Sequence, residues 1–409
     1  MHKKLLKYIL FCLVMIISIV LILNVVRHNT DEELNSSTIT SEYETKVSEI
    51  TDTDHENPDN PIDLSFVNEN VGWAVESNGY ASYIVKTTDG GKNWLNISSY
   101  NGDIIKIFFL DTLNGWAVTQ SNTSNSTEYL FLKTEDGGKT FQVIYKKIIE
   151  SISLIQINYQ TTDLIFFDKN NGYVMLSGKL LKTTDGGQRW SVINPNIPDF
   201  NMTEMCFINV NVGWVGGSVA VNKDINKDAA DAYIYCTTDG GNNWSNQFQV
   251  SSSNNNYQIT HNYQINGISF IDNQYGWFLI ENITDLHTEL YRTVDGGKTF
   301  TEVSSNNLYL AGPNFSHILF LDEDIGFISY KTGGGSTQGG IYKTDDGGKT
   351  FKNLSNTSLN GNIIASGDIL FITPSNGYVI CPTLHDGNFI IKTTDQGNTW
   401  DQILPVSKY

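Results

Sequence analysis

The sequence predicts an all-β fold, a seven-bladed β-propeller of four-stranded blades, preceded by one N-terminal transmembrane helix. A motif of the form Thr-x-Asp-x-Gly-x-x-aromatic occurs seven times, and a second motif, Phe followed six residues later by Gly-aromatic, precedes each copy. Abundant Gly and aromatic residues with few Pro suit many short strands joined by tight turns. The helix is predicted from a single apolar run near the N-terminus.

The first domain, residues 1–30, carries a membrane signal. Three lysines precede an uninterrupted apolar run from Tyr8 to Val26, which is long enough to cross a hydrocarbon core. Acidic residues follow the run, so the positive-inside rule places the N-terminus in the cytoplasm and the rest of the chain outside. A cleaved signal peptide is the alternative, although no small-x-small cleavage site follows the run. We therefore expect a single-pass cell-membrane protein, or a secreted one if the segment is cleaved.

The remaining chain divides into a spacer, residues 31–60, and the propeller, residues 61–409. The spacer is rich in Asp, Glu, Ser and Thr and too polar to bury a core, so we expect it to be disordered. Three cysteines lie beyond the membrane segment. Cys206 and Cys236 fall on the expected first and third strands of one blade, which is too far apart for a disulfide.

The repeat is the feature that determines the fold prediction. Its aspartates are 47 to 56 positions apart, a period that suits one propeller blade. They are Asp89, Asp136, Asp185, Asp239, Asp295, Asp346 and Asp395. The second motif gives the pairs Phe66/Gly72, Phe109/Gly115, Phe166/Gly172, Phe207/Gly213, Phe270/Gly276, Phe320/Gly326 and Phe371/Gly377. All eight Trp residues occupy the aromatic positions of these two motifs, so the largest apolar side chains belong to the repeat.

Each repeat predicts four strands. The first strand ends near the Phe, Gly-aromatic opens the second, the third runs into the Thr, and the trailing aromatic starts the fourth. In the Asp-x-Gly turn between the third and fourth strands, the Asp can accept backbone N–H groups and the Gly can adopt a positive φ. We therefore expect the seven aspartates to form structural turns and to take no part in catalysis.

The Thr-x-Asp-x-Gly-x-x-Trp copies resemble the Asp-box of bacterial neuraminidase repeats. Together with Phe-x-Asp-x-x-x-Gly-Trp, they make the chain from about Pro61 to Tyr409 similar to the photosystem II stability and assembly factor family of seven-bladed propellers. In such families the Asp-boxes lie on peripheral turns away from the ligand. The family also associates an arginine-rich patch with partner binding. The three arginines here, Arg27, Arg189 and Arg292, cannot form one.

Several chemical classes are disfavoured. A sialidase needs three arginines around a carboxylate, and the three present are placed at the membrane and in or beside Asp-boxes. Another type of glycosidase would need two carboxyl groups about 5–10 Å apart, which sequence does not exclude. Asp224-x-Asn226-x-Asp228 is similar to the start of a calcium loop, but Ala229 stands where a Gly is required. We expect no cofactor and no bound metal.

The expected function is that of a non-enzymatic extracytoplasmic binding or assembly scaffold that contacts a protein through one propeller face. Specificity would lie in unrepeated segments: Ser121 to Glu128, Val221 to Asp231, Ser251 to Tyr263 and Lys331 to Gly340. The alternative is binding of a cell-surface polysaccharide, or glycoside hydrolase-like activity. A net charge of −18 argues against nucleic acid, and membrane contact is expected only through the N-terminal segment.

Ring closure stays open at this point. The chain enters the propeller with a first strand near Ile62 and leaves it with a fourth strand after Trp400, so no overlapping closing strand is evident.

The Asp turns generate the first testable prediction. Replacement of Asp185 by Ala should lower the free energy of unfolding by about 1–3 kcal/mol, because backbone donors in the turn lose their acceptor. Thermal and denaturant unfolding would measure the change. An unchanged unfolding curve would contradict a structural role for this carboxylate.

Overall fold

The computed structural model describes residues 47–49, 61–123, 125–150, 163–221, 229–252, 261–285, 287–304, 315–331, 339–354, 369–382 and 388–404. The predicted membrane anchor and most of the predicted spacer lie outside these ranges. Among the described residues, no helix has the length and apolar character needed to span a membrane.

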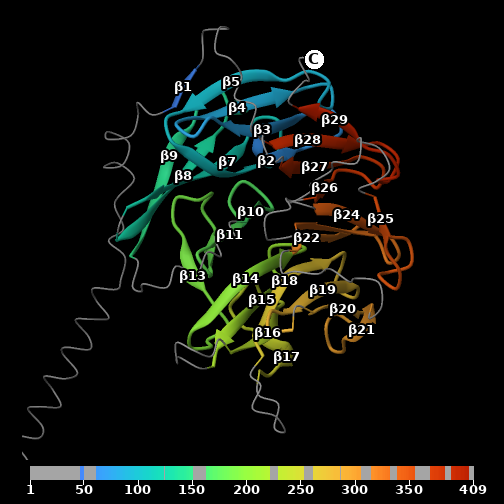
Figure 1. Ribbon diagram of the computed structural model, residues 1–409. Helices are drawn as coiled ribbons and strands as arrows, with labels where there is room; N and C mark the ends of the chain where they lie inside the picture. The colour runs from blue at the N-terminus through green and yellow to red at the C-terminus, as the bar shows by residue number, and fades with distance from the viewer. Residues whose placement is uncertain are drawn as a thin grey trace, which may run out of the picture.

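Seven antiparallel sheets follow one another around a ring, as Figure 1 shows. Six of the sheets have four strands and the first has five. Within each blade the four strands pair in chain order, and at five of the seven joints the first strands of neighbouring blades lie against one another. The prediction of an all-β, seven-bladed propeller is therefore confirmed.

The strands are assigned to the blades as follows. Blade 1 contains β2 (Pro61–Phe66), β3 (Gly72–Ser77), β4 (Ser82–Thr87) and β5 (Leu95–Tyr100), with β1 (Val47–Glu49) added; blade 2 contains β6 (Asp103–Phe109), β7 (Gly115–Asn122), β8 (Ser126–Thr134) and β9 (Gln142–Glu150). Blade 3 contains β10 (Asp163–Phe166), β11 (Gly172–Leu176), β12 (Lys179–Thr183) and β13 (Ser191–Ile193); blade 4 contains β14 (Phe200–Phe207), β15 (Gly213–Ala220), β16 (Ala230–Thr237) and β17 (Ser245–Val250). Blade 5 contains β18 (Tyr263–Phe270), β19 (Gly276–Asn282), β20 (His287–Thr293) and β21 (Thr301–Ser304); blade 6 contains β22 (Phe315–Phe320), β23 (Gly326–Lys331), β24 (Gly339–Thr344) and β25 (Lys352–Asn353). Blade 7 contains β26 (Ile369–Phe371), β27 (Gly377–Pro382), β28 (Asn388–Thr393) and β29 (Asp401–Leu404).

The predicted strand boundaries agree closely with these bounds. Every first strand ends at the motif Phe, every second strand begins at the motif Gly, and every third strand ends at the motif Thr. The fourth strand begins one residue after the trailing aromatic, not on it. The expectation of a variable loop from Ser121 to Glu128 was wrong, because Ser121 pairs with Glu128 and Asn122 with Thr127 in a longer β7–β8 hairpin.

A repeated aromatic stack joins each blade to the next. The aromatic residue that opens a second strand lies face to face with the Phe that ends the first strand of the following blade, with ring centroids 3.6–4.7 Å apart. The seven pairs are Trp73–Phe109, Trp116–Phe166, Tyr173–Phe207, Trp214–Phe270, Trp277–Phe320, Phe327–Phe371 and Tyr378–Phe66. Thirteen of these residues are buried between the blades, and Phe371 is half-buried.

The Gly of the second motif is explained by the same stack. Gly276 lies opposite Phe270 in the β18–β19 register, and a Cβ atom there would come 2.3 Å from the Phe270 ring. The ring therefore lies directly over the glycine backbone. Any larger residue would displace the Phe and separate it from the aromatic ring of the preceding blade.

Among the described residues, the ring closes without an overlapping strand. Tyr378 of blade 7 stacks on Phe66 of blade 1 at 3.9 Å, and Lys392 Nζ donates a 2.8 Å hydrogen bond to the carbonyl of Gly90. The joint between the last and first blades thus uses the contacts found between other blades. The spacer contributes β1, which pairs antiparallel with β5 at the edge of blade 1 and does not enter the closing joint.

Closure by packing can be tested at this joint. Tyr378→Ala should lower the free energy of unfolding by about 3–5 kcal/mol, the usual cost of removing a large buried aromatic side chain. Equilibrium unfolding would measure it. Tyr80→Ala is the control, because this side chain is 86% exposed and should change stability by less than about 0.5 kcal/mol. Equal effects of the two substitutions would argue that closure depends on something other than the stack.

Candidate functional site

The Asp turn, defined here as Thr-x-Asp-x-Gly between the third and fourth strands, has the same hydrogen bonds in all seven copies. In blade 2, Thr134 Oγ1 donates to Asp136 Oδ1 at 2.8 Å and accepts the N–H of Gly138 at 2.9 Å. The other six copies repeat both bonds. The Thr hydroxyl thus holds together the two ends of each turn.

The carboxylate in each Asp turn is occupied by groups of its own turn. Its Oδ1 accepts the backbone N–H four residues further on, at 2.8–3.0 Å. In six copies the side chain at that position, an Asn or a Thr, also donates to Oδ2. In blade 3 an arginine stands there, and Arg189 Nε lies 3.9 Å from Asp185 Oδ2.

The positive φ expected in these turns is present. Both glycines of each Asp-Gly-Gly have φ between 71° and 98°. In blade 7, Gln396 replaces the first glycine and still has a φ of 60°, so this position tolerates a side chain. The second glycine, Gly397 in that copy, would bring a Cβ atom 2.6 Å from Phe327 of blade 6. Packing against the preceding blade therefore explains why the second glycine occurs in every copy.

Titratable side chains also recur on the first strands, three residues before the motif Phe. Among the described residues these are Asp63, Lys106, Asp163, Glu204 and His317. Asp63 forms an ion pair with Lys106 at 3.2 Å and accepts the N–H of Ile107 at 2.6 Å. In the same way, His317 Nδ1 accepts the N–H of Ile369 in the next blade at 3.3 Å. At these two positions the side chain links neighbouring first strands.

The cysteines lie as the sequence suggested. Cys206 is on β14 and Cys236 on β16, with Trp214 of β15 paired between them, and both thiols are free. Burial raises the pKa of each of these thiols to about 11. Cys206 Sγ accepts the N–H of Phe270 at 3.3 Å, so this sulfur also contributes to a joint between blades.

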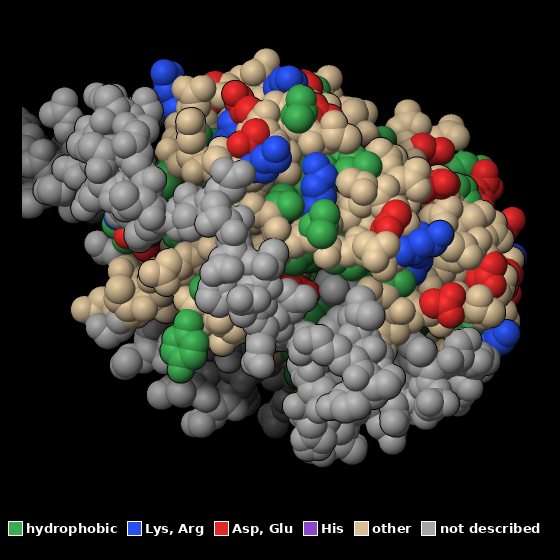
Figure 2. Space-filling model, turned by 90° about the horizontal axis from the view of Figure 1, so that it is seen from above, with side chains coloured by type: hydrophobic (Ala, Val, Ile, Leu, Met, Phe, Trp, Pro, Cys, Tyr) green, Lys and Arg blue, Asp and Glu red, His purple; other side chains and the backbone are tan. Residues whose placement is uncertain are grey.

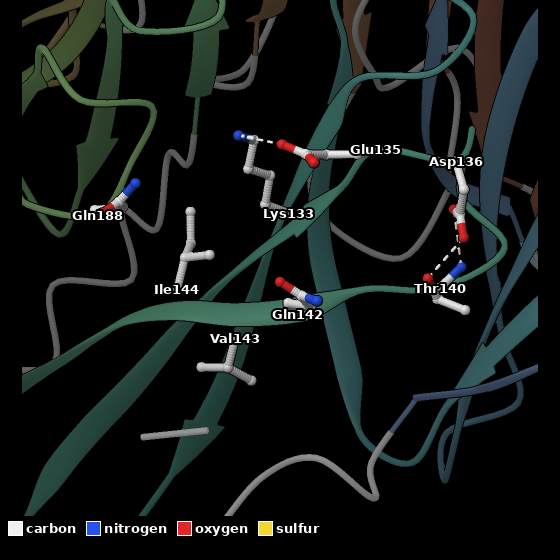
Figure 3. A pocket seen from close by; sticks show the side chains of 8 residues that line it. All are labelled: Lys133, Glu135, Asp136, Thr140, Gln142, Val143, Ile144 and Gln188. Atoms are coloured by element: carbon white, nitrogen blue, oxygen red, sulfur yellow. Dashed lines mark hydrogen bonds and ion pairs between the residues drawn. The ribbon is translucent and has the colours of Figure 1, made fainter. Parts of the chain in front are cut away.

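A cavity of about 400 Å³ lies between blades 2 and 3. Blade 2 contributes Lys133 from β8, three residues from β9 and part of its Asp turn; blade 3 contributes Gln188 from its own Asp turn. Figure 3 shows Gln188 on a separate ribbon facing Lys133 and Ile144. The remaining lining residues are Glu135, Asp136, Thr140, Gln142 and Val143.

The cavity wall combines charges, amides and apolar groups. Lys133 Nζ is 2.8 Å from Glu135 Oε1, and this contact holds the pKa of Glu135 below its ordinary value. The lysines of blades 3 and 7 that match Lys133 donate instead to a carbonyl of the next Asp turn. In blade 6 the matching Lys343 also pairs within its own blade, with Asp345 at 3.0 Å.

Two exposed apolar side chains come from the same part of the fold. Leu113 lies in the turn that contacts the blade 2 Asp turn, through its carbonyl to Gly137 N, and is 54% exposed. Val192 follows the blade 3 Asp turn on β13 and is 46% exposed.

Charged side chains are mixed on the side of the molecule that Figure 2 shows. Lysine or arginine side chains lie beside acidic ones there, with hydrophobic side chains between them. A polyanion would therefore meet no extended basic area on this side, in keeping with the acidic composition of the chain.

Sequence reasoning placed the seven aspartates in turns but did not find the cavity. Of the seven, the structure brings Asp136 to the cavity, and the other six are not among its lining residues. The one sequence signal for the site was the departure of Glu135 and Gln188 from the commonest residues at their repeat positions. Asp224, Asn226 and Asp228 lie outside the described residues, and within those residues no three His, Cys, Asp or Glu side chains form a metal-binding group.

No protein-family model and no curated protein matches the sequence. Solved structures share the propeller fold. A xyloglucanase of family GH74 from Xanthomonas campestris aligns with 84% of this chain at 10% identity and a TM-score of 0.49. A prolyl endopeptidase aligns with 90% at 9% identity and a TM-score of 0.51. A GH93 α-L-arabinofuranosidase of Fusarium graminearum aligns with 73% at 13% identity and a TM-score of 0.42.

The alignments cover 60% of the xyloglucanase, 52% of the endopeptidase and 97% of the arabinofuranosidase. The chain therefore corresponds to little more than half of the first two proteins. Of these three alignments, that with the endopeptidase has a TM-score above 0.5, and at 9% identity it shows a common fold alone.

The hydrogen bonds in the Asp turns predict a loss of stability in acid. Bonds from the side chain and backbone of Asn93 lower the pKa of Asp89 from 3.8 to about 2, and bonds from Thr299 lower the pKa of Asp295 equally far. The folded pKa lies below the unfolded one, so this stabilisation is complete above about pH 4 and is lost as the pH falls through 2.

The experiment compares the unaltered protein with the double variant Asp89→Asn and Asp295→Asn. Denaturant unfolding between pH 2 and pH 7 should show a shallower acid-induced fall in the free energy of unfolding for the variant. Identical slopes would mean that these two carboxylates are not more acidic in the folded state.

Proposed function

We propose that this chain is a non-enzymatic extracytoplasmic binding scaffold, held at the membrane by its N-terminal segment and contacting a protein through one propeller face. The Asp-box resemblance and the membrane signal in the sequence support this proposal. Recognition of a protein then depends on groups that differ from blade to blade on an otherwise repeated framework.

The observation that carries the proposal is the cavity between blades 2 and 3. It combines an ion pair, two carboxamides and two aliphatic side chains, and Leu113 and Val192 add exposed apolar surface to the same two blades. A segment of a partner protein can place a polar side chain in such a cavity while apolar groups contact its surroundings.

The titratable groups favour binding over catalysis. The seven Asp-turn carboxylates each accept hydrogen bonds within their own turn, and Glu135 is held ionised by Lys133. Arg189 is exposed in an Asp turn, and the guanidinium of Arg292 lies 5.3 Å from the centre of the Trp277 ring. These two arginines are therefore used in separate blades and do not converge on one substrate carboxylate.

Site-specific cross-linking would test the proposal in the living organism. A photoreactive side chain placed at Gln188 should cross-link to one membrane or cell-surface protein, because Gln188 forms the blade 3 side of the cavity. The matched control is Lys298, which has the same place in the blade 5 Asp turn. The substitution Leu113→Asp should reduce the yield from position 188 by about tenfold, as expected for loss of an interface anchor.

The same adduct from positions 188 and 298, or no protein adduct from position 188, would contradict a partner at this cavity. An adduct that Leu113→Asp leaves unchanged would contradict the assignment of Leu113 to the interface.

A further inference from the structure

The third strand of blade 4, β16, has two faces of different character. Ala232, Ile234 and Cys236 are buried and pack toward blade 5. On the opposite face, toward blade 3, Asp231, Tyr233 and Tyr235 are only half-buried.

Tyr235, the tyrosine nearest the Asp turn, stands at a position where four blades have an aliphatic residue and blades 5 and 6 have Tyr291 and Tyr342. At the position of Tyr235, blades 1, 2, 3 and 7 have Val85, Leu132, Leu181 and Ile391, all of which are at most 4% exposed. In these blades an aliphatic side chain fills the joint to the preceding blade. Tyr235 packs against the joint to blade 3 but is half-buried where the aliphatic residues are buried, and Tyr233 extends the same aromatic face toward the far end of the strand.

The two tyrosines form a platform with Phe200. The ring centroids of Tyr233 and Tyr235 are 6.1 Å apart and their planes differ by 27°. Phe200 meets both rings edge-on, at 6.3 Å from Tyr233 and 5.7 Å from Tyr235. Because Phe200 supports both rings from one side, their relative orientation is fixed before any ligand binds.

Two carboxamides from the neighbouring strand β17 extend this platform. Gln249 Nε2 donates to the Tyr233 hydroxyl at 3.3 Å, and Asn246 Nδ2 donates to the Tyr235 hydroxyl at the same distance. Both amides are on exposed residues, so their positions border solvent. Each tyrosine is thereby paired with one amide across the β16–β17 ladder.

The charge of this region is low. Asp231 is the one charged residue of β16 and β17, and its Oδ1 accepts the N–H of Ser252 at 2.6 Å. No lysine or arginine occurs on either strand. On the described residues of β16 and β17 an anionic ligand would therefore meet a carboxylate and no lysine or arginine, whereas a neutral ligand meets no electrostatic penalty there.

We propose that Phe200, Tyr233, Tyr235, Asn246 and Gln249, together called the tyrosine surface, bind a neutral polysaccharide chain. The negative face of an aromatic ring attracts the weakly positive C–H groups on the flat side of a sugar ring. The neighbouring amides can pair with sugar hydroxyls, which gives orientation. Of the strongly exposed large hydrophobic side chains of the described residues, none lies on β14–β17 and one, Val221, directly follows β15.

The test uses the full-length protein in detergent and affinity electrophoresis through gels that contain a soluble polysaccharide. Hydroxyethylcellulose and galactomannan are the neutral probes, and carboxymethylcellulose is the anionic probe with the same backbone as the first. At least one neutral probe should retard the protein, and carboxymethylcellulose should retard it less than hydroxyethylcellulose does. Absence of retardation by both neutral probes, or stronger retardation by the anionic one, would overturn the proposal.

Substitutions test whether the polysaccharide binds at the tyrosine surface of blade 4. Tyr233→Ala should weaken retardation by about tenfold, the effect of losing one well-placed aromatic contact, and Gln249→Ala should weaken it less. The matched control is Tyr83→Ala, since Tyr83 has the position of Tyr233 in blade 1 and accepts a bond from Asn78. Tyr233→Phe keeps the ring and should retain most binding, which separates stacking from a folding defect. Equal losses from the blade 1 and blade 4 alanine variants would refute a site on blade 4.

The tyrosine surface is independent of the cavity between blades 2 and 3. Tyr233→Ala should leave cross-linking from position 188 unchanged, so failure of either proposal can be recognised without the other.

Discussion

The fold depends on one contact, the face-to-face stack between the aromatic residue that opens a second strand and the Phe that ends the first strand of the next blade. It requires a glycine beneath the Phe ring, because a Cβ atom there would overlap the ring, as at Gly276 and Phe270. The stack also orders the Asp turns. The indole N–H groups of Trp73, Trp116 and Trp277 donate to the first-glycine carbonyl of the next blade's Asp turn. At these three joints the stacked tryptophan therefore both packs two blades together and holds the Asp turn of the next blade in place.

Because similar contacts recur at each joint, a joint that lacks some of them shows which contacts the fold can lose. At the joint between blades 4 and 5, Trp214 Nε1 is buried and has no hydrogen-bond partner within the described part of the chain. Cys236 replaces the lysine that usually precedes the motif Thr, and Cys206 Sγ accepts the N–H that Ser65 and Ser269 accept in other blades. This joint keeps the aromatic stack while lacking some polar contacts. Hydrophobic packing is therefore the common requirement, and the hydrogen bonds vary.

The polar groups of the repeated turns form their hydrogen bonds within the propeller. Side chains that can bind a partner are therefore sought at the positions where the blades differ. The cavity occurs where Lys133 pairs with Glu135 within its own blade, and the tyrosine surface occurs where two half-buried rings extend along β16. Both features involve the sides of blades, whereas the sequence had directed attention to the long unrepeated segments. Most of those segments lie outside the described residues, so strands and turns carry the sites argued from the structure.

The sequence by itself determined the number of blades, the strand boundaries and the positions of the turns, because each depends on local chemistry that recurs seven times: a Phe, a Gly-aromatic pair and an Asp turn. Only the tertiary structure decided how the ring closes, since Tyr378 and Phe66 meet only when blade 7 reaches blade 1. It also decided which side chains share a site. Gln188 and Lys133 are 55 positions apart, and the amide–tyrosine pairs depend on strand register. A sequence motif predicts contacts within one repeat. The two sites instead arise from contacts between repeats or between neighbouring strands.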